Sequence, residues 1–571
     1  MRDVRRKVLF GFFVAGFGAI LARTLQLQLF PGSRLNALME RNLARDISLV
    51  GRRGTLRDRN GAELAVSVDS LSVFIDPKLF PKKRSRDLME RISRVTGLSV
   101  VQLNQKIQEN RKRRFVWIRR QLDTEAVKLW SKLKLSTVPG LGALPEFRRV
   151  YPFDSLASQV LGFVSVDGRG LEAAERGFDK DLGGERLRVR VPTDAKGRPV
   201  FKQEEQVQFR EMAGKDMVLS LDHRIQFAAE RALKSAIDKH RAHAGSVVVM
   251  DPHTGEMLAM ASLPTFDPNL VGESESSQRR NRIVSDWFEP GSVVKPLVVL
   301  EGLNRGLFSP KTIISGGGGS VRIGRKVITE ADTKHYFDKI SVHDTIKFSS
   351  NVGMVSLVQR FGFDFVQDAL TKLSFGKRTG IDLPSETAGL FRIPKAKQNL
   401  EKATISYGHG IAVTPLQLAS AYSVIANGGF EVKPTVLKVD ETHPAVVKNR
   451  KALFSKQAIA QVRGMLSAVV NDGGTGTTAA LDTVAVAGKT GTAWKVDTEA
   501  GGYKSRAYVS SFAGYFPAEE PRFVIAVSID EPSENGYYGG AVAGPVVKEV
   551  AFEIMRFSES FRSPIVNVMA R

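Results

Sequence analysis

The pattern of hydrophobic positions begins with an apolar run near the N-terminus. Uncharged residues run from Val8 to Ala22, Arg23 interrupts them, and apolar positions continue to residue 30. A bilayer core needs about 20 helical residues, so the pattern predicts a membrane-spanning helix over 8–30, with Arg23 snorkelling or facing another helix. The basic residues of the 1–7 tail predict a cytoplasmic N-terminus, with the rest of the chain outside. A cleaved signal peptide is the rival interpretation, but no small-x-small cleavage motif follows the run.

The next stretch, residues 45–212, mixes short alternating segments with helical ones. Asn60-Gly61 lies between two extended segments and predicts a tight hairpin. Residues 69–122 combine α and β patterns, and the charged alternation over 185–208 predicts partly exposed strands. We therefore expect a mixed α/β domain that ends near Met212 to Met217.

A second domain is expected over 217–558, followed by a tail at 559–571. Asp222 is suited to cap a helix whose apolar residues share one face. Several helical stretches are expected over 343–427. Strands are predicted at 246–250, 256–261, 484–494, 510–516 and 522–530, and a last helix at 542–556. Strands at both ends of a helical middle predict an α+β fold, one antiparallel sheet with helices on both faces.

Composition adds a strong charge asymmetry. The chain has 83 Lys and Arg against 60 Asp and Glu, a formal charge of +23, which suits an anionic partner of some kind. Arg111 to Arg114 and Arg119-Arg120 flank Phe115 to Ile118, a pattern that also occurs in nucleic-acid-binding proteins. Beside a membrane anchor, a solvated face around one buried strand is the better interpretation. The absence of cysteine excludes disulfides and thiolate metal sites.

The first candidate for chemistry is Ser-x-x-Lys at Ser292 and Lys295. A serine needs a base within hydrogen-bond reach to become a nucleophile, and residues three apart share a helix face. Pro290-Gly291 is a plausible turn into a helix, and Leu297 to Leu300 gives that helix a buried run. Pro296 is tolerated only in a first turn. Alone, the motif is weak, since a capping serine and a solvated lysine would look the same.

Two further motifs follow in the chain. Ser349-Ser350-Asn351 offers a hydroxyl that can relay a proton and an amide that can hold a carbonyl group. In a predicted strand, Lys489 supplies positive charge, Thr490 and Thr492 can bind a carboxylate, and Gly491 leaves room for a peptide added as a further strand. The order SxxK, SxN, KTG is the pattern of penicillin-binding proteins and serine β-lactamases.

With these motifs the chain resembles the class B penicillin-binding proteins, in particular the division-specific (FtsI-type) peptidoglycan D,D-transpeptidases. The resemblance covers nearly the whole chain, including a non-catalytic pedestal at 45–212 of the penicillin-binding-protein dimerisation type. One departure is Ser158-Gln159, where family members often have Ala-His. The most specific stretches are Asn281-Arg282, Phe288 to Pro296, Ile405 to Gly410 and Tyr537 to Gly540, and the pedestal carries Arg53-Gly54, Arg149 to Pro152 and Gly170 to Glu172.

The resemblance implies an acyl-enzyme mechanism. Ser292 would attack the carbonyl between the two terminal D-alanines of a stem peptide, while Lys295 takes its proton. Backbone N–H groups of Ser292 and Thr492 would form the oxyanion hole. Ser349 and Lys489 would pass the proton to the leaving D-alanine. Burial and the Lys489 charge are both expected to depress the pKa of Lys295 strongly.

The resemblance also implies how the substrate is held. Asn351 would orient the substrate amide, and Thr490 and Thr492 would hold its carboxylate. Ser350 and Gly491 complete the expected substrate-binding set. No cofactor and no metal are expected, because His240 and His243 lack supporting ligands and Gly316 to Gly319 lacks a phosphate-loop ending. Gly473 to Gly476 is a loop that can line the cleft.

Expected partners are peptidoglycan stem peptides ending in D-Ala-D-Ala, β-lactams as covalent inhibitors, a membrane-embedded glycan polymerase and other divisome membrane proteins. We expect a single-pass protein of the inner membrane with a periplasmic catalytic domain, and no nucleic-acid partner.

Three alternatives stay open at this point. One is the elongation-specific transpeptidase of the same class. Another is a D,D-carboxypeptidase or β-lactamase, although no Glu-x-x-Leu-Asn stretch lies between the second and third motifs. A non-enzymatic division scaffold or nucleic-acid-binding membrane protein is the third.

Overall fold

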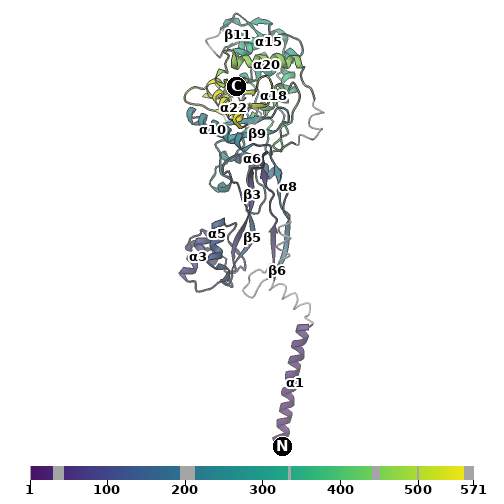
Figure 1. Ribbon diagram of the computed structural model, residues 1–571, viewed down its shortest axis with the longest axis vertical. Coiled ribbons are helices and arrows are strands. Elements are labelled where there is room, and N and C mark those ends of the chain that lie inside the picture. The colour runs from purple at the N-terminus through teal and green to yellow at the C-terminus, as the bar shows by residue number, and fades with distance from the viewer. Residues whose placement is uncertain are drawn as a thin grey trace, which may run out of the picture.

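The computed structural model describes residues 2–29, 44–192, 212–331, 336–439, 451–497 and 500–557. Its outline is elongated, with a long N-terminal helix, a narrow stalk of strands and a large head that carries the C-terminal half (Figure 1). The predicted tail at 559–571 and the predicted strands beyond residue 192 lie outside the described residues.

The N-terminal helix, α1, spans Arg2–Leu29. Within Asp3–Gln26, an 18-residue window has a mean hydropathy of 1.9, and its apolar side chains are exposed in the isolated chain. This is the length and character of a membrane-spanning helix, so the helix predicted from the apolar run is confirmed as a helix.

The stalk is built on one long strand, β3 (Glu63–Ile75). It pairs antiparallel with β2, β4 and β5, and a second, two-stranded sheet joins β1 to β6. The predicted Asn60-Gly61 hairpin is confirmed, since it connects β2 to β3. The other stalk strands are β1 (Ala44–Val50), β2 (Leu56–Arg57), β4 (Val116–Arg119), β5 (Leu141–Val150), β6 (Arg186–Pro192) and β7 (Met217–Val218).

A small lobe, residues 76–140, hangs from the end of the stalk that is remote from the head (Figure 1). Its helices α3 (Arg86–Thr96), α4 (Val100–Glu109) and α5 (Thr124–Lys132) cover a core of their own with β4. Ser85, Ser99 and Asp123 cap these helices through their side chains.

A buried ion cluster holds the stalk together where its predicted motifs meet. The Glu175 carboxylate accepts from Arg53 Nε at 2.5 Å and from Arg149 Nε at 2.7 Å, while Arg53 Nη1 also bonds Asp179 at 2.6 Å. Tyr151 donates to Glu175 as well, and its burial raises its pKa well above the usual value. A buried carboxylate with this many donors is compensated, so the cluster fixes three distant segments in one arrangement.

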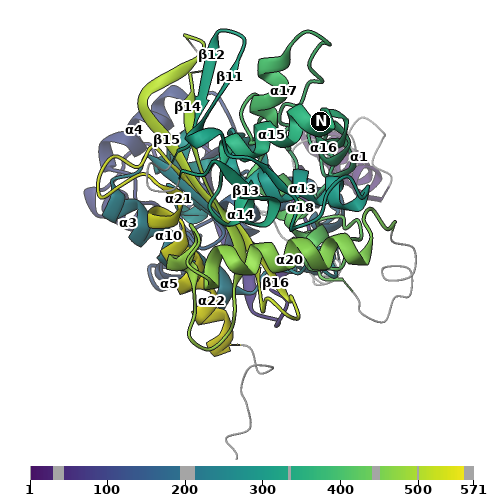
Figure 2. The same cartoon turned by 90° about the horizontal axis from the view of Figure 1, so that it is seen from above.

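The head contains one five-stranded antiparallel sheet in the order β14-β15-β16-β8-β9. Helices α10 and α22 cover one face, while α13, α18 and α20 pack on the other (Figure 2). The predicted α+β fold is therefore confirmed. These elements are β8 (Ala244–Met250), β9 (Met257–Leu263), β14 (Ala487–Val496), β15 (Tyr503–Phe516), β16 (Phe523–Asp530), α10 (His223–His240), α13 (Lys295–Asn304), α18 (Pro415–Ala426), α20 (Lys456–Asn471) and α22 (Gly544–Phe557).

The predicted head elements recur close to their expected bounds, and Asp222 does cap α10. One difference is β15, which begins at Tyr503 rather than near residue 510, because its first residues project beyond the core and show no apolar alternation.

The remaining elements are short: η1 (Leu135–Thr137), α6 (Ser158–Leu161), α7 (Ala173–Gly177), α8 (Asp179–Leu182), η2 (Pro268–Glu273), α11 (Ser276–Arg279), α12 (Arg282–Ser285), η3 (Gly291–Val294), β10 (Ile313–Ser315), η4 (Gly317–Gly319), β11 (Ser320–Ile323), β12 (Lys326–Thr329), β13 (Lys339–Ser341), α14 (Val342–Lys347), α15 (Asn351–Phe361), α16 (Asp364–Lys372), α17 (Asn399–Ser406), η5 (Thr477–Ala479) and α21 (Gly539–Val542).

Candidate active site

The predicted nucleophile lies on a tight turn at the start of a buried helix. Ser292 belongs to the 3₁₀ turn η3, and Lys295 is the first residue of α13, where Pro296 is tolerated in the first turn. A 3₁₀ turn has three residues per turn, so side chains three apart lie directly above each other. Gly291 enters this turn with φ +57°, a conformation that favours glycine. The structure therefore places Ser292 and Lys295 on one face of this turn, as the SxxK spacing predicts, with Ser292 partly exposed.

Lys295 is fully buried, and its amine is held by the second motif. Its Nζ donates to the Ser349 carbonyl oxygen at 2.5 Å and to Asn351 Oδ1 at 2.8 Å, with Ser349 Oγ at 3.4 Å. Burial lowers the pKa of Lys295 to about 7, against an opposing effect of the Glu330 charge. A large fraction of this amine is thus neutral near neutral pH, which a general base requires.

The second motif lies at the turn between α14 and α15. Ser349 has φ +62°, which is uncommon for a residue other than glycine, and this directs its carbonyl oxygen to Lys295. Ser350 caps α15 by accepting from Gly353 N at 2.8 Å. The Ser350 side chain is only 3% exposed, so it supports the helix that carries Asn351 instead of facing the cleft.

Glu330, in the connection after β12, is a residue that the sequence analysis missed. Its carboxylate accepts from Asn351 N at 2.6 Å and from Ser350 Oγ at 2.5 Å. It therefore anchors the start of α15 and places a negative charge near Lys295. Glu330 lies 20 residues before Ser350 with no local motif around it, so no signal in a single sequence could have identified it.

The third motif lies on β14, the edge strand of the head sheet. Its residues pair only with β15 in this sheet, with Thr490 opposite Phe512 and Thr492 opposite Ser510. An edge strand leaves one row of backbone groups available for a further strand. The predicted docking of a peptide along this strand is therefore geometrically possible.

Lys489 is buried in the same region as Lys295. Burial and then the charge of Lys295 lower the pKa of Lys489 well below its usual value. The charge of Lys489 was expected to lower the pKa of Lys295. The structure shows the reverse, since the charge of Lys295 lowers the pKa of Lys489. The Lys489 amine donates to Thr490 O at 3.1 Å and to Thr475 Oγ1 at 3.4 Å. Thr475 Oγ1 also lies 2.8 Å from Thr490 Oγ1, so the loop at 473–476 lines the site.

Small residues bring β14 into direct contact with η3, the turn that carries Ser292, which we call the nucleophile turn. A Cβ on Gly491 would lie 2.7 Å from the Pro290 oxygen and 2.5 Å from Ser511 Oγ. The glycine at 491 is thus explained by packing against this turn, in addition to any room it leaves for a substrate. Thr492 accepts from Gly539 N at 2.9 Å, which fixes its hydroxyl.

The Tyr407 to Gly410 stretch supports the same turn from the other side. Gly291 N donates to Gly408 O at 3.0 Å, and Glu289 accepts from Gly410 N at 2.8 Å. Glu289 also accepts from the Tyr503 hydroxyl of β15 at 3.0 Å. Burial, and then the charge of Lys295, lower the pKa of His409 to about 4, so His409 is neutral near pH 7.

Within the described part of the chain, metal-suited side chains gather at one place only, Asp58, Asp222 and His223. Asp58 Oδ2 lies 2.6 Å from His223 Nδ1, and Asp222 accepts from Asn60 Nδ2 at 2.9 Å. These bonds join the stalk hairpin to the first residues of α10, and we call this cluster the junction clasp. Hydrogen bonds from neighbouring groups satisfy the carboxylates of Asp58 and Asp222. These bonds explain why the three side chains lie together, without a bound ion.

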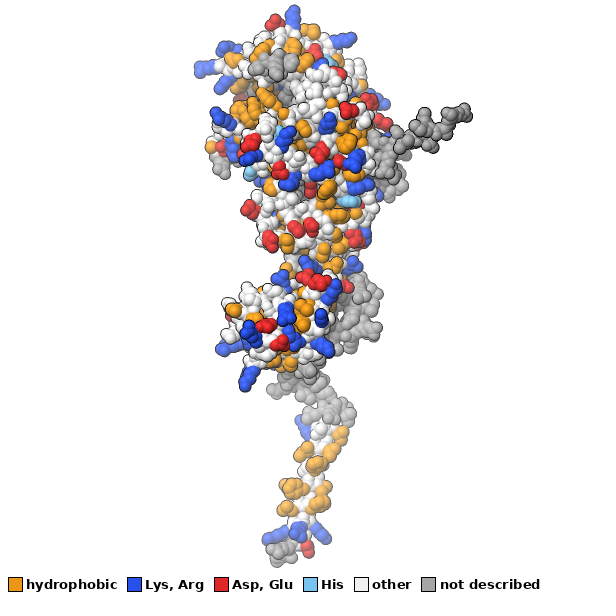
Figure 3. All heavy atoms as spheres, turned by 60° about the vertical axis from the view of Figure 1, so that its left-hand side comes forward, with side chains coloured by type: hydrophobic (Ala, Val, Ile, Leu, Met, Phe, Trp, Pro, Cys, Tyr) orange, Lys and Arg blue, Asp and Glu red, His pale blue; other side chains and the backbone are white. Residues whose placement is uncertain are grey.

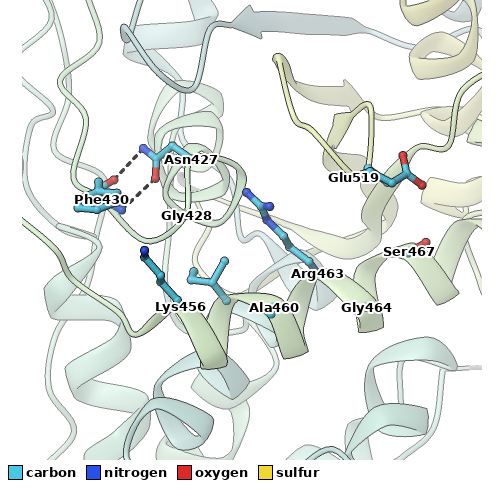
Figure 4. A pocket seen from close by; sticks show the side chains of 11 residues that line it. Asn427, Gly428, Phe430, Lys456, Ala460, Arg463, Gly464, Ser467 and Glu519 are labelled. Atoms are coloured by element: carbon cyan, nitrogen blue, oxygen red, sulfur yellow. Dashed lines mark hydrogen bonds between the residues drawn. The ribbon is translucent and has the colours of Figure 1, made fainter. Parts of the chain in front are cut away.

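A separate hollow of about 550 Å³ lies along α20, beside the loop after α18 (Figure 4). Arg463 crosses it and donates to the carbonyl oxygens of Ile425 and Ala426. None of the three motifs contributes to its lining. The candidate active site is therefore the cleft between η3, α15 and β14, and this hollow is distinct from it.

Together the three motifs form one chemical arrangement. A partly exposed hydroxyl lies one turn from a buried amine, with a second buried lysine and an open strand edge beside it. Such a site can form a covalent ester with a carbonyl substrate that docks along the strand.

Comparison with known proteins gives the same picture. Residues 245–551 match the family model "Penicillin binding protein transpeptidase domain", and residues 48–219 match "Penicillin-binding Protein dimerisation domain". The probable peptidoglycan D,D-transpeptidase PenA of Neisseria meningitidis is 37% identical over 534 residues, covering 94% of this chain and 89% of the relative. Peptidoglycan D,D-transpeptidase FtsI of Escherichia coli is 33% identical over 507 residues, covering 88% and 83%.

The solved structures include a penicillin-binding protein 3 from Mycobacterium in complex with aztreonam. It superposes with a TM-score of 0.66 at 28% identity, covering 89% of this chain and 97% of that one.

Proposed function

The chain belongs to the class B penicillin-binding proteins, the peptidoglycan D,D-transpeptidases, and from this premise we propose that its reaction proceeds through an ester on Ser292 in septal cell-wall synthesis. The observation that carries the assignment of Ser292 is its place one 3₁₀ turn before the buried Lys295, whose amine is bonded to Ser349 and Asn351. We also assign 45–212 to the pedestal and 217–558 to the transpeptidase domain.

The first half of the reaction is acylation. Neutral Lys295 accepts the proton of the Ser292 hydroxyl, and the oxygen attacks the carbonyl carbon of the penultimate D-alanine. Backbone N–H groups of Ser292 and Thr492 stabilise the oxyanion. The C–N bond then breaks, and the leaving D-alanine amine takes the proton back through Ser349 and Lys489. The contact of Lys295 Nζ with Ser349 Oγ at 3.4 Å supports this relay.

Binding of the donor peptide uses the open edge of β14. The peptide adds as a further strand, which aligns its scissile carbonyl with Ser292. Asn351 orients the substrate amide, while Thr490 and Thr492 hold the terminal carboxylate. The packing of Gly491 against Pro290 supports this step, because it fixes the strand relative to the nucleophile.

The second half resolves the ester. An amine on a neighbouring stem peptide attacks the Ser292 ester, and Lys295 accepts the proton that this amine releases. The Ser292 oxygen leaves and is protonated, so the enzyme returns to its starting state and an amide crosslink forms. A β-lactam would follow the first half and stop at the ester, as a covalent inhibitor.

We further propose that α1 anchors the chain in the inner membrane, with the N-terminus cytoplasmic and the catalytic domain periplasmic. The apolar character of α1 and the basic residues at its N-terminal end support this. A membrane-embedded glycan polymerase and other divisome membrane proteins are the proposed partners. A fluorescent fusion tests the septal role: midcell localisation supports it, and lateral localisation would indicate elongation instead.

The proposed nucleophile is tested by covalent labelling. Full-length protein treated with benzylpenicillin should gain the mass of one penicilloyl group, and peptide mapping should place it on Ser292. Ser292→Ala should abolish labelling by a fluorescent penicillin, while Ser356→Ala on α15, away from the motifs, should keep it. Persistent labelling of the Ser292→Ala protein at the same peptide would refute the assignment.

A further inference from the structure

The lobe at residues 76–140 carries a large share of the positive charge of the chain. It holds 17 Lys and Arg against 6 Asp and Glu, a net charge of +11 of the total +23. The catalytic mechanism uses none of these residues. In the space-filling view, blue side chains surround this lobe (Figure 3).

The basic residues gather at one end of the lobe. Ile75, the last residue of β3, pairs with Val116 at the start of β4 and with Leu141 at the start of β5. The connections 76–85 and 110–115 therefore begin or end where these strands end, on the same side of the sheet. Lys78, Lys82 and Lys83 lie on the first connection, Arg111 to Arg114 lie on the second, and all are exposed.

This end of the sheet points away from the catalytic head. The opposite end of β3 lies beside the junction clasp, at the head. β1 begins at Ala44 and leads towards that same junction, so Ala44 also lies at the remote end. Leu29, the last residue of α1, is 15 positions before Ala44, a reach of about 50 Å at full extension. The basic end of the lobe thus lies on the side from which the anchor arrives.

The charges at this end are not neutralised locally. Among the described residues, ion pairs of the lobe involve Arg86, Arg91, Arg120 and Lys128, and none of them involves a residue of 78–83 or 111–114. Leu79 stands between the lysines and is 41% exposed. Clustered basic side chains around an exposed apolar one suit an interface between water and lipid headgroups.

We propose that the basic end of the lobe, residues 78–83 and 111–114, rests on anionic phospholipid headgroups of the membrane that holds α1. This inference relies on the proposed membrane anchoring and adds a second contact to it. The lipid surface is favoured over a nucleic acid or an acidic protein, because α1 brings that surface to this end of the stalk. Two contacts fix the tilt of the stalk, whereas a single helix leaves it free to swing.

The experiment uses the full-length chain in lipid nanodiscs. The protein has no cysteine, so Gln108→Cys, exposed at the end of α4, gives a single labelling site beside 111–114. A fluorophore there is quenched by lipids that carry a spin label on the headgroup. Quenching should be at least threefold stronger in discs containing phosphatidylglycerol than in pure phosphatidylcholine, and about 0.5 M salt should remove the difference.

Charge variants make the test specific. Changing Arg111, Lys112, Arg113 and Arg114 together to Gln should lower the lobe's occupancy of anionic discs at least tenfold, since each basic residue at such a surface contributes about a fivefold factor. A matched control removes the same charge from the head.

The control changes Lys377, Arg378, Lys395 and Lys397 to Gln, all exposed in the head, and should quench like the parent protein. Co-elution of the chain with the disc reports on the anchor separately from the lobe. Equal quenching in neutral and anionic discs, or equal loss in both variants, would overturn the proposal. A response to a soluble acidic polymer but to no lipid would also overturn it.

Discussion

In the proposed mechanism, the protonation of Lys295 decides when the candidate site can react. The side chain is completely buried, yet its amine has three oxygen neighbours, in Ser349 and Asn351. Burial favours the neutral amine, while the nearby Glu330 charge favours the ammonium form. The balance between them leaves the pKa about 7, close to the value at which a general base works best near neutral pH.

The pH dependence of acylation follows from this value. Lys295 must be neutral to accept the Ser292 proton, so the second-order rate constant for benzylpenicillin should reach half its plateau near pH 7. Below that midpoint it should fall about tenfold for each pH unit, because the neutral fraction falls by that factor. Stopped-flow measurement between pH 5 and 8.5 checks this, and a rate independent of pH across that range would exclude Lys295 as the base.

Replacement of Glu330 by Gln should move this profile. Removing the carboxylate charge lowers the pKa of Lys295, so the acidic limb should shift to lower pH. The plateau should also fall, because Glu330 holds Asn351 in place through charged bonds. Weakening the bonds from Ser350 and Asn351 costs about 1.5–3 kcal/mol.

Glu273→Gln, a change at an exposed carboxylate, is the control and should leave both midpoint and plateau in place. An unchanged midpoint in the Glu330 variant would show that its charge does not act on Lys295.

What the sequence predicted at this scale depended on contiguous motifs. Ser292 with Lys295, the Ser349 to Asn351 triplet and Lys489 to Thr492 each form a short pattern with a chemical reason, and the structure brings them together. Glu330 could not be predicted, because its contacts come from a loop that folds onto the second motif from 20 to 21 positions away. The loop that carries Thr475 was expected to line the cleft, but the bonds of Thr475 to the third motif, 14 and 15 positions away, were not predicted. Their residue types alone are ordinary in any loop.

At the scale of elements, the site depends on how closely β14 approaches η3. The Gly491 Cα faces the Pro290 oxygen and Ser511 so closely that no side chain fits between them. Gly408 is similarly close to Gly291 from the other side. The nucleophile turn is therefore clamped between a strand and a loop, which holds the hydroxyl still before a substrate arrives.

Gly491→Ala should disrupt this clamp. The added methyl would lie 2.5 Å from Ser511 Oγ and 2.7 Å from Pro290 O, so β14 must move away from the turn. We expect the acylation rate to fall by about 100-fold, since small displacements of reacting groups have effects of this size. Acylation kinetics and the melting temperature together check this.

Gly464→Ala is a matched control on α20, where a Cβ meets nothing within 4 Å. It should leave acylation unchanged and stabilise the helix by about 0.5–1 kcal/mol. Equal acylation by both variants would show that the clamp does not position Ser292.

The elements themselves were predictable where period and capping agree. Asp222 before an amphipathic run gave α10, and short, nearly continuous apolar runs gave β8, β9 and β16. The exposed first part of β15 was missed, because its pairing with β14 rests on backbone bonds and the turn, without a buried face. The order of the strands in the sheet is a long-range property that no local pattern contains.

At the scale of the whole molecule, stalk and head meet at the junction clasp. Burial opposes ionisation of Asp58, but its bonds to His223 and to backbone N–H groups outweigh this and lower its pKa. A carboxylate with a depressed pKa stabilises the folded state above its unfolded pKa, and this contribution is lost as pH falls through the folded value. The clasp should therefore weaken in acid, below pH 3.8.

Asp58→Asn should lower the free energy of unfolding at pH 7 by about 1–3 kcal/mol, since a charged hydrogen bond is replaced at a buried site. The difference from the parent protein should shrink as pH falls below 3.8, because the unfolded chain then binds the proton more readily than the folded protein, whose Asp58 has a lowered pKa. Chemical denaturation at pH 7 and pH 3 measures both values. Asp181→Asn, half exposed on α8, should change little at either pH, and a constant difference for Asp58→Asn would contradict the linkage.

The length of the stalk also sets the distance between the lobe and the head. β3 runs for 13 residues between the head and the lobe, about 43 Å at the usual rise of a strand. With one end held at the lipid surface, the serine would operate at a fixed height above it. Only glycan chains lying at that height would be joined. The length of β3 would thus set the thickness of the gap between the membrane and the wall.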